Sequence, residues 1–128
     1  MSQRDDSGFK SYEADEAIEL YSRVKLDADG KITKAGLTDK SIGTLQTEAA
    51  LAAGQVVSVK LRSAAGTHKV RVSEALAAGA TIYSEADGEV QDTAQATSFM
   101  EGTALEAATA DNDIVEMIYN NAGDTAAS

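Results

Sequence analysis

Two stretches of the chain, VKLDADGKI at residues 24–32 and IYSEADGEV at 82–90, repeat one order of residue types at an offset of 58 positions. In each stretch an alternating apolar segment runs into Ala-Asp-Gly, and a second apolar segment follows. Alternation of this kind is typical of half-buried β-strands, and Asp-Gly is typical of the tight turn that joins two of them. A chain built this way is restricted to short strands and tight turns.

Two further landmarks keep nearly the same spacing, because Gly43 matches Gly102 and Val57 matches Val115. Similarity at a constant offset indicates copies of one structural unit. We therefore predict two copies of a unit with the order strand, Ala-Asp-Gly turn, strand, Gly-Thr crossing, strand. The copies span about residues 24–61 and 82–119.

The first Asp-Gly turn also resembles the start of a calcium-binding EF-hand loop, because Asp27 and a second aspartate precede Gly30. With Gly30 at the sixth loop position, the first and twelfth positions are Lys25 and Gly36, where carboxylates are required. In the second copy only the Asp-Gly pair survives, ending in Gly88. We predict two turns in which Gly30 and Gly88 supply positive φ, and no metal site.

The remaining segments predict a mainly β fold. Alternation predicts strands at 18–26, 57–61, 68–73 and 113–119, with a helix over 12–21 as the alternative for the first of them. The phrase LAAG occurs at 51–54 and 76–79, and its glycines, Gly54 and Gly79, turn the chain into the strands that follow. Alanine-rich pieces predict short helical turns or irregular crossings. The expected architecture is a small single-domain β-barrel or sandwich with a possible internal two-fold repeat.

Composition sets further limits. The 128 residues suffice for one domain with a modest core. There is no cysteine, hence no disulfide or thiolate chemistry. No apolar run approaches a membrane span and the N-terminus lacks an apolar signal core, so we expect a soluble protein made without export. A net charge of −10 argues against nucleic-acid binding.

The charge is unevenly placed. Residues 1–20 hold two basic and six acidic residues, residues 21–72 hold nine and four, and residues 73–128 hold none and eleven. One interpretation is that strands of the two halves interleave in one sheet and their charges pair across it. The other is a subunit with a basic face and an acidic face, suited to head-to-tail packing.

The sequence contains no combination of residues that is typical of a catalytic site. His68 follows Ala-Ala-Gly-Thr in a loop-like stretch without a cysteine or serine-elbow partner, so we expect it to be solvated. Asp111, Asp113 and Glu116 are more simply explained by a polar turn before an apolar strand than by an acid–base pair or a metal cluster. We predict no enzyme activity, no cofactor and no metal.

The chain is expected to divide into three parts. Residues 1–16 are polar and predict a flexible arm, residues 17–119 form the β domain, and residues 120–128 form a frayed tail. The arm carries Phe9 and Tyr12, which are candidate anchors for a partner surface. The alternative is that this segment folds back on its own barrel.

Three phrases, SRVKLDADGKITKAG, LAAGATIYSEADGEV and GTALEAATADNDIVEMIY, resemble the small capsid cement, or head decoration, proteins of tailed bacteriophages. That family typically shows a strand into an Asp-Gly turn, then phrases of the type aaGd-v-y, and a close of the type G-ALE-A…G-i-V-v. The resemblance covers about residues 12–119, and the order and spacing of the motifs carry it. Asp111-Asn112-Asp113 departs from the glycine common in the last turn, but Asn tolerates positive φ, so a turn is still expected.

The resemblance implies a β-barrel or sandwich that binds the major capsid protein on the outside of the expanded capsid. Such proteins often bind as homotrimers at local three-fold positions and stabilise the shell against internal DNA pressure. Made in the host cytoplasm, the protein would end on the outer surface of the virion, with Phe9, Lys10 and Tyr12 of the arm as candidate capsid contacts. Negative charge suits such a role, because it favours solubility and avoids the packaged DNA.

The alternative function is a carbohydrate- or surface-binding β module of a phage fibre or receptor-binding structure. Sugar sites commonly stack rings on exposed aromatic side chains, and this chain has six aromatic residues and no Trp. Tyr83 and Tyr119 are the residues to test for it. The small number of aromatic residues counts against this alternative.

Overall fold

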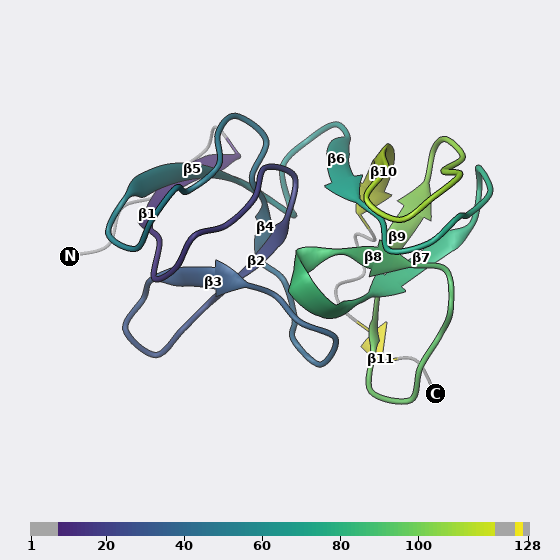
Figure 1. Cartoon of the computed structure of the whole chain (residues 1–128), viewed down its shortest axis with the longest axis horizontal. Helices are drawn as coiled ribbons and strands as arrows, with labels where there is room; N and C mark the ends of the chain where they lie inside the picture. Colours follow the sequence, from purple (N-terminus) through teal and green to yellow (C-terminus); the bar gives the residue numbers. More distant parts are fainter. Residues whose placement is uncertain (1–7, 120–124, 127–128) are drawn as a thin grey trace.

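The computed structural model describes residues 8–119 and 125–126, which form two antiparallel sheets of short strands (Figure 1). The first sheet contains β1 (Phe9–Glu13), β2 (Arg23–Leu26), β3 (Ile32–Lys34), β4 (Gly43–Thr44) and β5 (Val56–Leu61). The second sheet contains β6 (His68–Arg71), β7 (Thr81–Ser84), β8 (Val90–Gln91), β9 (Phe99–Ala104), β10 (Ile114–Tyr119) and β11 (Thr125–Ala126). The predicted mainly β class is confirmed.

The internal repeat is present in the topology. Strand order is β1-β5-β4-β2-β3 in the first sheet and β6-β10-β9-β7-β8 in the second, with β11 added beside β9. Adding five to each strand number converts the first order into the second. We call residues 8–66 the first lobe and the described residues from 67 onward the second lobe (left and right in Figure 1).

Each sheet curls until its two edges meet. A parallel bridge joins Ala14 to Ile32 in the first lobe, and an equivalent bridge joins Val72 to Val90 in the second. The backbone hydrogen bonds that follow are equivalent too, from Asp15 N to the Ile32 carbonyl and from Ser73 N to the Val90 carbonyl. Each lobe is therefore a small, nearly closed barrel.

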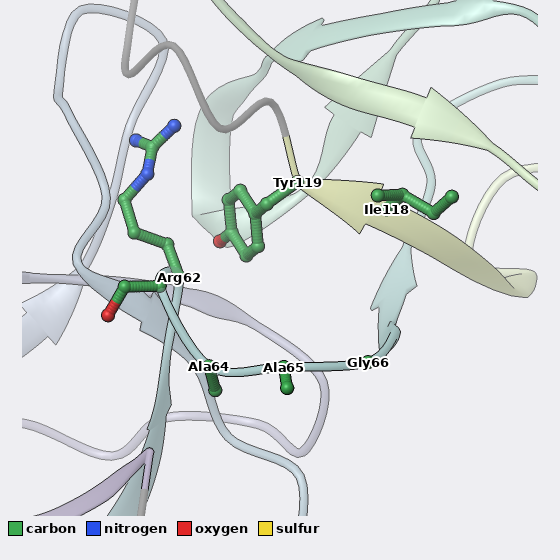
Figure 2. A pocket seen from close by; sticks show the side chains of 7 residues that line it. Arg62, Ala64, Ala65, Gly66, Ile118 and Tyr119 are labelled. Atoms are coloured by element: carbon green, nitrogen blue, oxygen red, sulfur yellow. The ribbon is translucent and has the colours of Figure 1, made fainter. Parts of the chain in front are cut away.

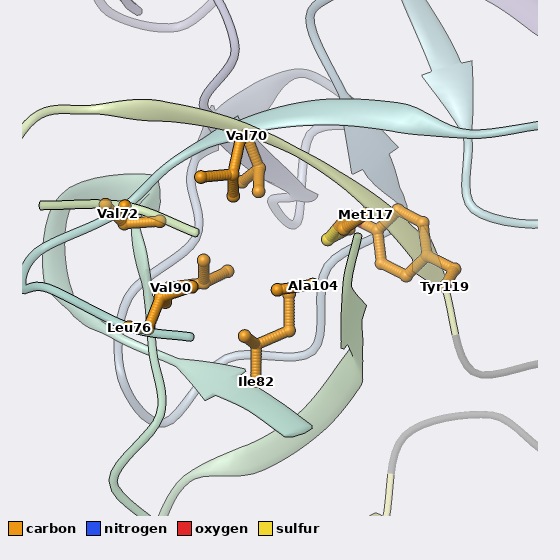
Figure 3. Packing of buried hydrophobic residues seen from close by; sticks show 10 residues of the cluster. Val70, Val72, Leu76, Ile82, Val90, Ala104, Met117 and Tyr119 are labelled. Carbon is orange, nitrogen blue, oxygen red and sulfur yellow. The ribbon is translucent and has the colours of Figure 1, made fainter. Parts of the chain in front are cut away.

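The hydrophobic core is divided in the same way. Alternate residues of each strand point inward, so that Val57 and Val59 are buried on β5 while Val56 is exposed. The second lobe has its own cluster, in which Val70, Ile82 and Met117 converge from three strands (Figure 3). The chain thus has two small cores, one per lobe, in place of the single core expected from its length.

The predicted Asp-Gly turns are confirmed. In the first lobe Asp27 Oδ1 accepts hydrogen bonds from the backbone N–H groups of Asp29 and Lys31, at 2.9 and 3.0 Å. Gly30 has φ of 78° and Gly88 has φ of 76°, so both need the conformational freedom of glycine. The carboxylate that suggested a calcium ligand caps the turn.

One predicted strand is shorter than its alternation indicates. Tyr21 has φ of 67°, outside the strand region, and β2 begins only at Arg23. Before it, Ile18 forms an isolated bridge with Ala50. The prediction of a continuous strand over 18–26 was wrong because the chain turns at Tyr21.

Part of the predicted arm is a strand. Phe9–Glu13 is β1, paired with β5 from Phe9 opposite Lys60 to Glu13 opposite Val56. Backbone pairing and burial of Ala14 outweigh the polar composition of this segment. The rest of the expected arm up to residue 7, and most of the expected tail, lie outside the described residues, although β11 falls within that tail.

Helical structure among the described residues is limited to η1, a 3-10 turn at Ala86–Gly88. The alanine-rich pieces form irregular crossings between strands. This was one of the two alternatives predicted for them, the other being short helical turns. Within the part of the chain that is described, no helix has the length and apolar character of a membrane span.

Candidate binding surfaces and the interface between the lobes

The two lobes are joined by a polar interface centred on Arg23. Its guanidinium donates hydrogen bonds to the carbonyl groups of Glu85 (2.6 Å) and Glu89 (2.9 Å), which flank the β7–β8 turn of the second lobe. In the same turn Gly88 N–H donates to the Ala35 carbonyl of the first lobe at 2.8 Å. A Cβ at Gly88 would lie 3.0 Å from the Arg23 carbonyl oxygen, so glycine permits this close approach.

Behind Arg23 lie three more buried side chains with polar contacts to one another, those of Glu101, Ser41 and Tyr119. Glu101 of β9 lies 3.9 Å from the Arg23 guanidinium and accepts a hydrogen bond from Ser41 Oγ at 2.9 Å. Ser41 Oγ also lies 3.2 Å from the Tyr119 hydroxyl. Burial and the Glu101 charge raise the pKa of Tyr119, so it stays a neutral hydrogen-bonding group.

His68 belongs to the same interface, which corrects the expectation of a solvated loop histidine. It is the first residue of β6, is 1% exposed, and its Nδ1 lies 2.8 Å from Thr44 Oγ1 across the interface. Its ring packs edge-on against Tyr119, with centroids 4.7 Å apart. Burial and the charges of Lys60 and Arg62 lower its pKa to about 4.

The Thr44–His68 contact has the spacing of a hydroxyl nucleophile and its base. Both side chains are buried, so a substrate has no path to them. No pattern in the sequence indicated this contact, because its two members are 24 residues apart on different lobes. The contact joins the two lobes.

The acidic residues near the end of the chain form a polar turn, as predicted. Asp113 Oδ2 accepts hydrogen bonds from the backbone N–H groups of Thr109 (2.8 Å) and Ala110 (3.1 Å), and these bonds lower its pKa. Glu116 points elsewhere and accepts a hydrogen bond from the Thr67 hydroxyl. Among the described residues no three His, Cys, Asp or Glu side chains are grouped so as to hold a metal ion.

The charge asymmetry follows the lobes. The two sheets do not share strands, so the interleaved arrangement is wrong. Residues 8–66 carry eight basic and eight acidic residues, whereas residues 67–119 carry two and ten, a net charge of −8. Acids such as Glu13, which pairs with Lys31 at 3.3 Å, offset the basic segment. The molecule therefore has a neutral lobe and an acidic lobe.

The three residues expected to contact a capsid are placed on β1. Tyr12 packs against the core of the first lobe, and Lys60 Nζ lies 6.0 Å from the centre of the Phe9 ring. Phe9 and Lys10 are half-buried at the sheet edge. The segment thus folds back on its own barrel, which was the alternative. The four glycines singled out from the sequence are spread over separate turns and all have positive φ: Gly30, Gly54, Gly79 and Gly88.

Two shallow pockets flank the end of β10. One, of about 270 Å³, is lined by Arg62, the loop 63–66 and the residues Ile118 and Tyr119 (Figure 2). The other, of about 330 Å³, lies on the outer face of the second sheet, beside Thr103 and Ile118. Tyr119 is 4% exposed and Tyr83 is half-buried, so neither offers an open ring face for stacking a sugar.

The repeat extends to individual hydrogen bonds that sequence reasoning missed. Glu16 accepts from Lys34 N–H in the first lobe, and Glu74 accepts from Asp92 N–H at the equivalent place in the second. The available signal was the match of DEAI at 15–18 with SEAL at 73–76, which extends the repeat toward the N-terminus. The second LAAG phrase belongs to this match, since Gly79 is equivalent to Tyr21 and both have positive φ.

Comparison with known proteins adds one finding. No family model and no curated protein matches the sequence. Among solved structures, the chain is similar to the head fiber gp8.5 N base of bacteriophage phi29, with a TM-score of 0.69 and 15% sequence identity. The match covers 91% of this chain and 96% of that one. The likeness is one of fold. It includes both lobes, since neither alone would reach that coverage.

Proposed function

We propose that this chain is a non-enzymatic structural protein of the head of a tailed bacteriophage. In this proposal it decorates the outer surface of the expanded capsid and stabilises the shell against internal DNA pressure. The observation that carries the proposal is the similarity in fold, over nearly the full length of both chains, to a phage head fiber base. The order of motifs along the sequence points in the same direction.

The architecture supports a role in binding rather than catalysis. The Thr44–His68 pair is sealed between the lobes, and polar contacts from Arg23 fix the lobes in one arrangement. A body held in this way loses little conformational freedom on docking, which favours repeated attachment to equivalent sites.

Charge indicates which end faces the shell. The first lobe is net neutral and carries the N-terminal end, whereas the second has a net charge of −8 over residues 67–119. Burying an excess of one charge without partners requires its desolvation, so the lobe whose charges balance is the better docking surface. We assign the residues that precede β1, at the N-terminal end of the first lobe, to the major capsid protein and the second lobe to the outside.

The test is a titration of the purified protein onto expanded capsids that lack it, with bound copies counted by sedimentation and gel densitometry. Saturation at a fixed number set by icosahedral symmetry supports decoration, and the number separates trimer sites from monomer sites. Absence of saturable binding by a folded protein would overturn the proposal.

A truncation tests the assigned end. A variant that begins at Gly8 keeps β1 intact, and we expect it to bind capsids more weakly than the full chain. A matched control lacks residues 127 and 128 at the other end of the chain and should bind normally. Equal binding by both truncated chains would place the capsid contact elsewhere.

A further inference from the structure

One row of side chains crosses the outer face of the first sheet. Arg23 on β2 pairs with Thr44 on β4, and Thr44 pairs with Lys60 on β5. Cross-strand partners lie on the same face of a sheet, and the neighbours Val24, Leu45 and Val59 occupy the core face. We call Arg23, Thr44 and Lys60 the first outer row.

The second lobe covers this row with two of its segments. The β7–β8 turn receives the Arg23 hydrogen bonds through the carbonyl groups of Glu85 and Glu89. The start of β6 covers the rest, since His68 meets Thr44 and the Thr67 carbonyl accepts from Lys60 Nζ. Arg23 and Thr44 are fully buried as a result.

Beside the first outer row, Gln46 also binds the start of β6. Its side-chain amide donates to the Lys69 carbonyl at 2.7 Å, and its oxygen accepts from Lys69 N–H at 2.9 Å. The first outer row and Gln46 thus form a binding face for residues 67–69 and the β7–β8 turn.

The repeat places an equivalent row on the second sheet. Thr81 pairs with Thr103, and Thr103 with Ile118, in the same register as the first outer row. We call Thr81, Thr103 and Ile118 the second outer row. Both threonines are exposed and Ile118 is 46% exposed, with the pocket of about 330 Å³ beside them. Leu105, the equivalent of Gln46, is 39% exposed.

We propose that the second outer row binds the first lobe of a second copy of this chain, by the contact that joins the lobes within one copy. The repeat identifies the segments that would dock. Residues 67–69 are equivalent to Phe9, Lys10 and Ser11 on β1, and the β7–β8 turn is equivalent to the β2–β3 turn around Gly30. The contact joins two different surfaces, so copies associate head to tail.

The properties of the two surfaces fit this pairing. On the docking side Leu26, at the start of the β2–β3 turn, is 43% exposed, and Ser11 is exposed. On the receiving side apolar and hydroxyl groups replace the buried Arg23 and the half-buried Lys60, which suits a face that is open to water before assembly. Lys10 takes the place of His68 and brings a positive charge to the acidic lobe.

Cysteine cross-linking tests the pairing, because the chain has no cysteine of its own. The Gln46–Lys69 contact within one copy corresponds to Leu105 of one copy and Ser11 of the next. Mixing the single variants Ser11→Cys and Leu105→Cys under mild oxidation should give a disulfide-linked dimer on a non-reducing gel. Mixing Ser11→Cys with Leu51→Cys is the matched control, since Leu51 is 81% exposed and lies on the other lobe.

A second variant pair separates surface contact from folding. Ile118→Glu places a charge on the second outer row and should abolish the cross-link, whereas Leu51→Glu should leave it unchanged. Thermal unfolding of each variant verifies that it is folded.

Three outcomes would overturn the proposal. One is a Ser11–Leu105 cross-link no stronger than that of the control mixture. Another is dominant Ser11–Ser11 linkage, which would show a symmetric contact. The third is linkage of Ser11→Cys on decorated particles to capsid protein carrying surface cysteines but not to Leu105→Cys copies, which would give this surface to the capsid.

Discussion

The guanidinium of Arg23 and the carboxylate of Glu101 lie 3.9 Å apart across the interface between the lobes, and neither side chain is exposed to solvent. Buried opposite charges depend on each other, since removing one leaves the charge of the other less well compensated away from water. This pair makes the relative position of the lobes sensitive to single substitutions.

We expect Glu101→Gln to lower the free energy of unfolding by about 3–5 kcal/mol, because it leaves the Arg23 charge buried without its counter-ion. The double variant Arg23→Met/Glu101→Gln should lose less than the sum of the two single variants. Urea unfolding measures all three. Lys25→Met, which removes a half-exposed ion pair with Asp39, is the control and should cost at most about 1 kcal/mol. Additive losses would contradict the coupling.

Gly102→Ala should destabilise the protein by about 1–3 kcal/mol or more, because a Cβ there would lie 1.9 Å from the Ile118 carbonyl oxygen. Gly30→Ala is a matched control, since nothing lies within 4 Å of its Cβ position and only its positive φ opposes the change. That control should cost about 1 kcal/mol. If chemical denaturation gave the same loss in free energy of unfolding for Gly102→Ala and Gly30→Ala, the backbone of β9 and β10 would be able to move apart at little cost.

Stability should fall as the pH drops from about 6.5 to about 4. His68 has a pKa of about 4 in the folded protein and about 6.5 when unfolded, so in this window the unfolded chain takes up a proton that the native protein does not. The loss attributable to His68 should reach about 2–3 kcal/mol near pH 4 and then level off. His68 is the sole histidine, so the difference between wild type and His68→Gln isolates it from the carboxylates. Identical pH profiles of the two proteins would contradict its burial.

Asn112 occupies the position that Gly54 holds in the first lobe, and its φ is 71°. Replacing it by Ala should cost about 1 kcal/mol, because a Cβ opposes the left-handed conformation and Asn tolerates it better. Asn112→Gly should change stability by less than about 0.5 kcal/mol. Thermal unfolding compares the two variants, and a larger loss for Gly than for Ala would refute the equivalence.

Strands and turns could be predicted from the sequence because their signals are local. Alternation located β5, β6 and β10, and Asp-Gly located both turns, since each pattern reflects the backbone over a few residues. The Gly43–Gly102 landmark correctly marked equivalent places in the two copies, but the Gly-Thr pairs predicted as crossings lie in strands, β4 and β9. At both glycines a Cβ would strike a carbonyl oxygen of the paired strand.

The interface between the lobes could not be predicted, because its contacts join distant residues of mixed chemistry. His68 was expected in solvent, since a single histidine in a loop-like stretch carries no pattern, yet Thr44 lies against it in the fold. The distribution of charge along the sequence was also misleading, because it too depends on which segments lie together in the fold. The basic segment is offset by acids earlier in the same lobe, such as Glu13 against Lys31, which became visible only once β1 was placed.

Each curled sheet is closed by a bridge, Ala14 to Ile32 in the first lobe and Val72 to Val90 in the second. These bridges affect how the molecules interact when they are crowded together. Exposed strand edges can pair with those of neighbouring molecules and lead to amyloid-like aggregation. Where each lobe joins its own edges, that route is restricted, even at high local concentrations of the protein. Contacts between molecules then depend on sheet faces, where single side chains can tune how firmly and how reversibly neighbours adhere.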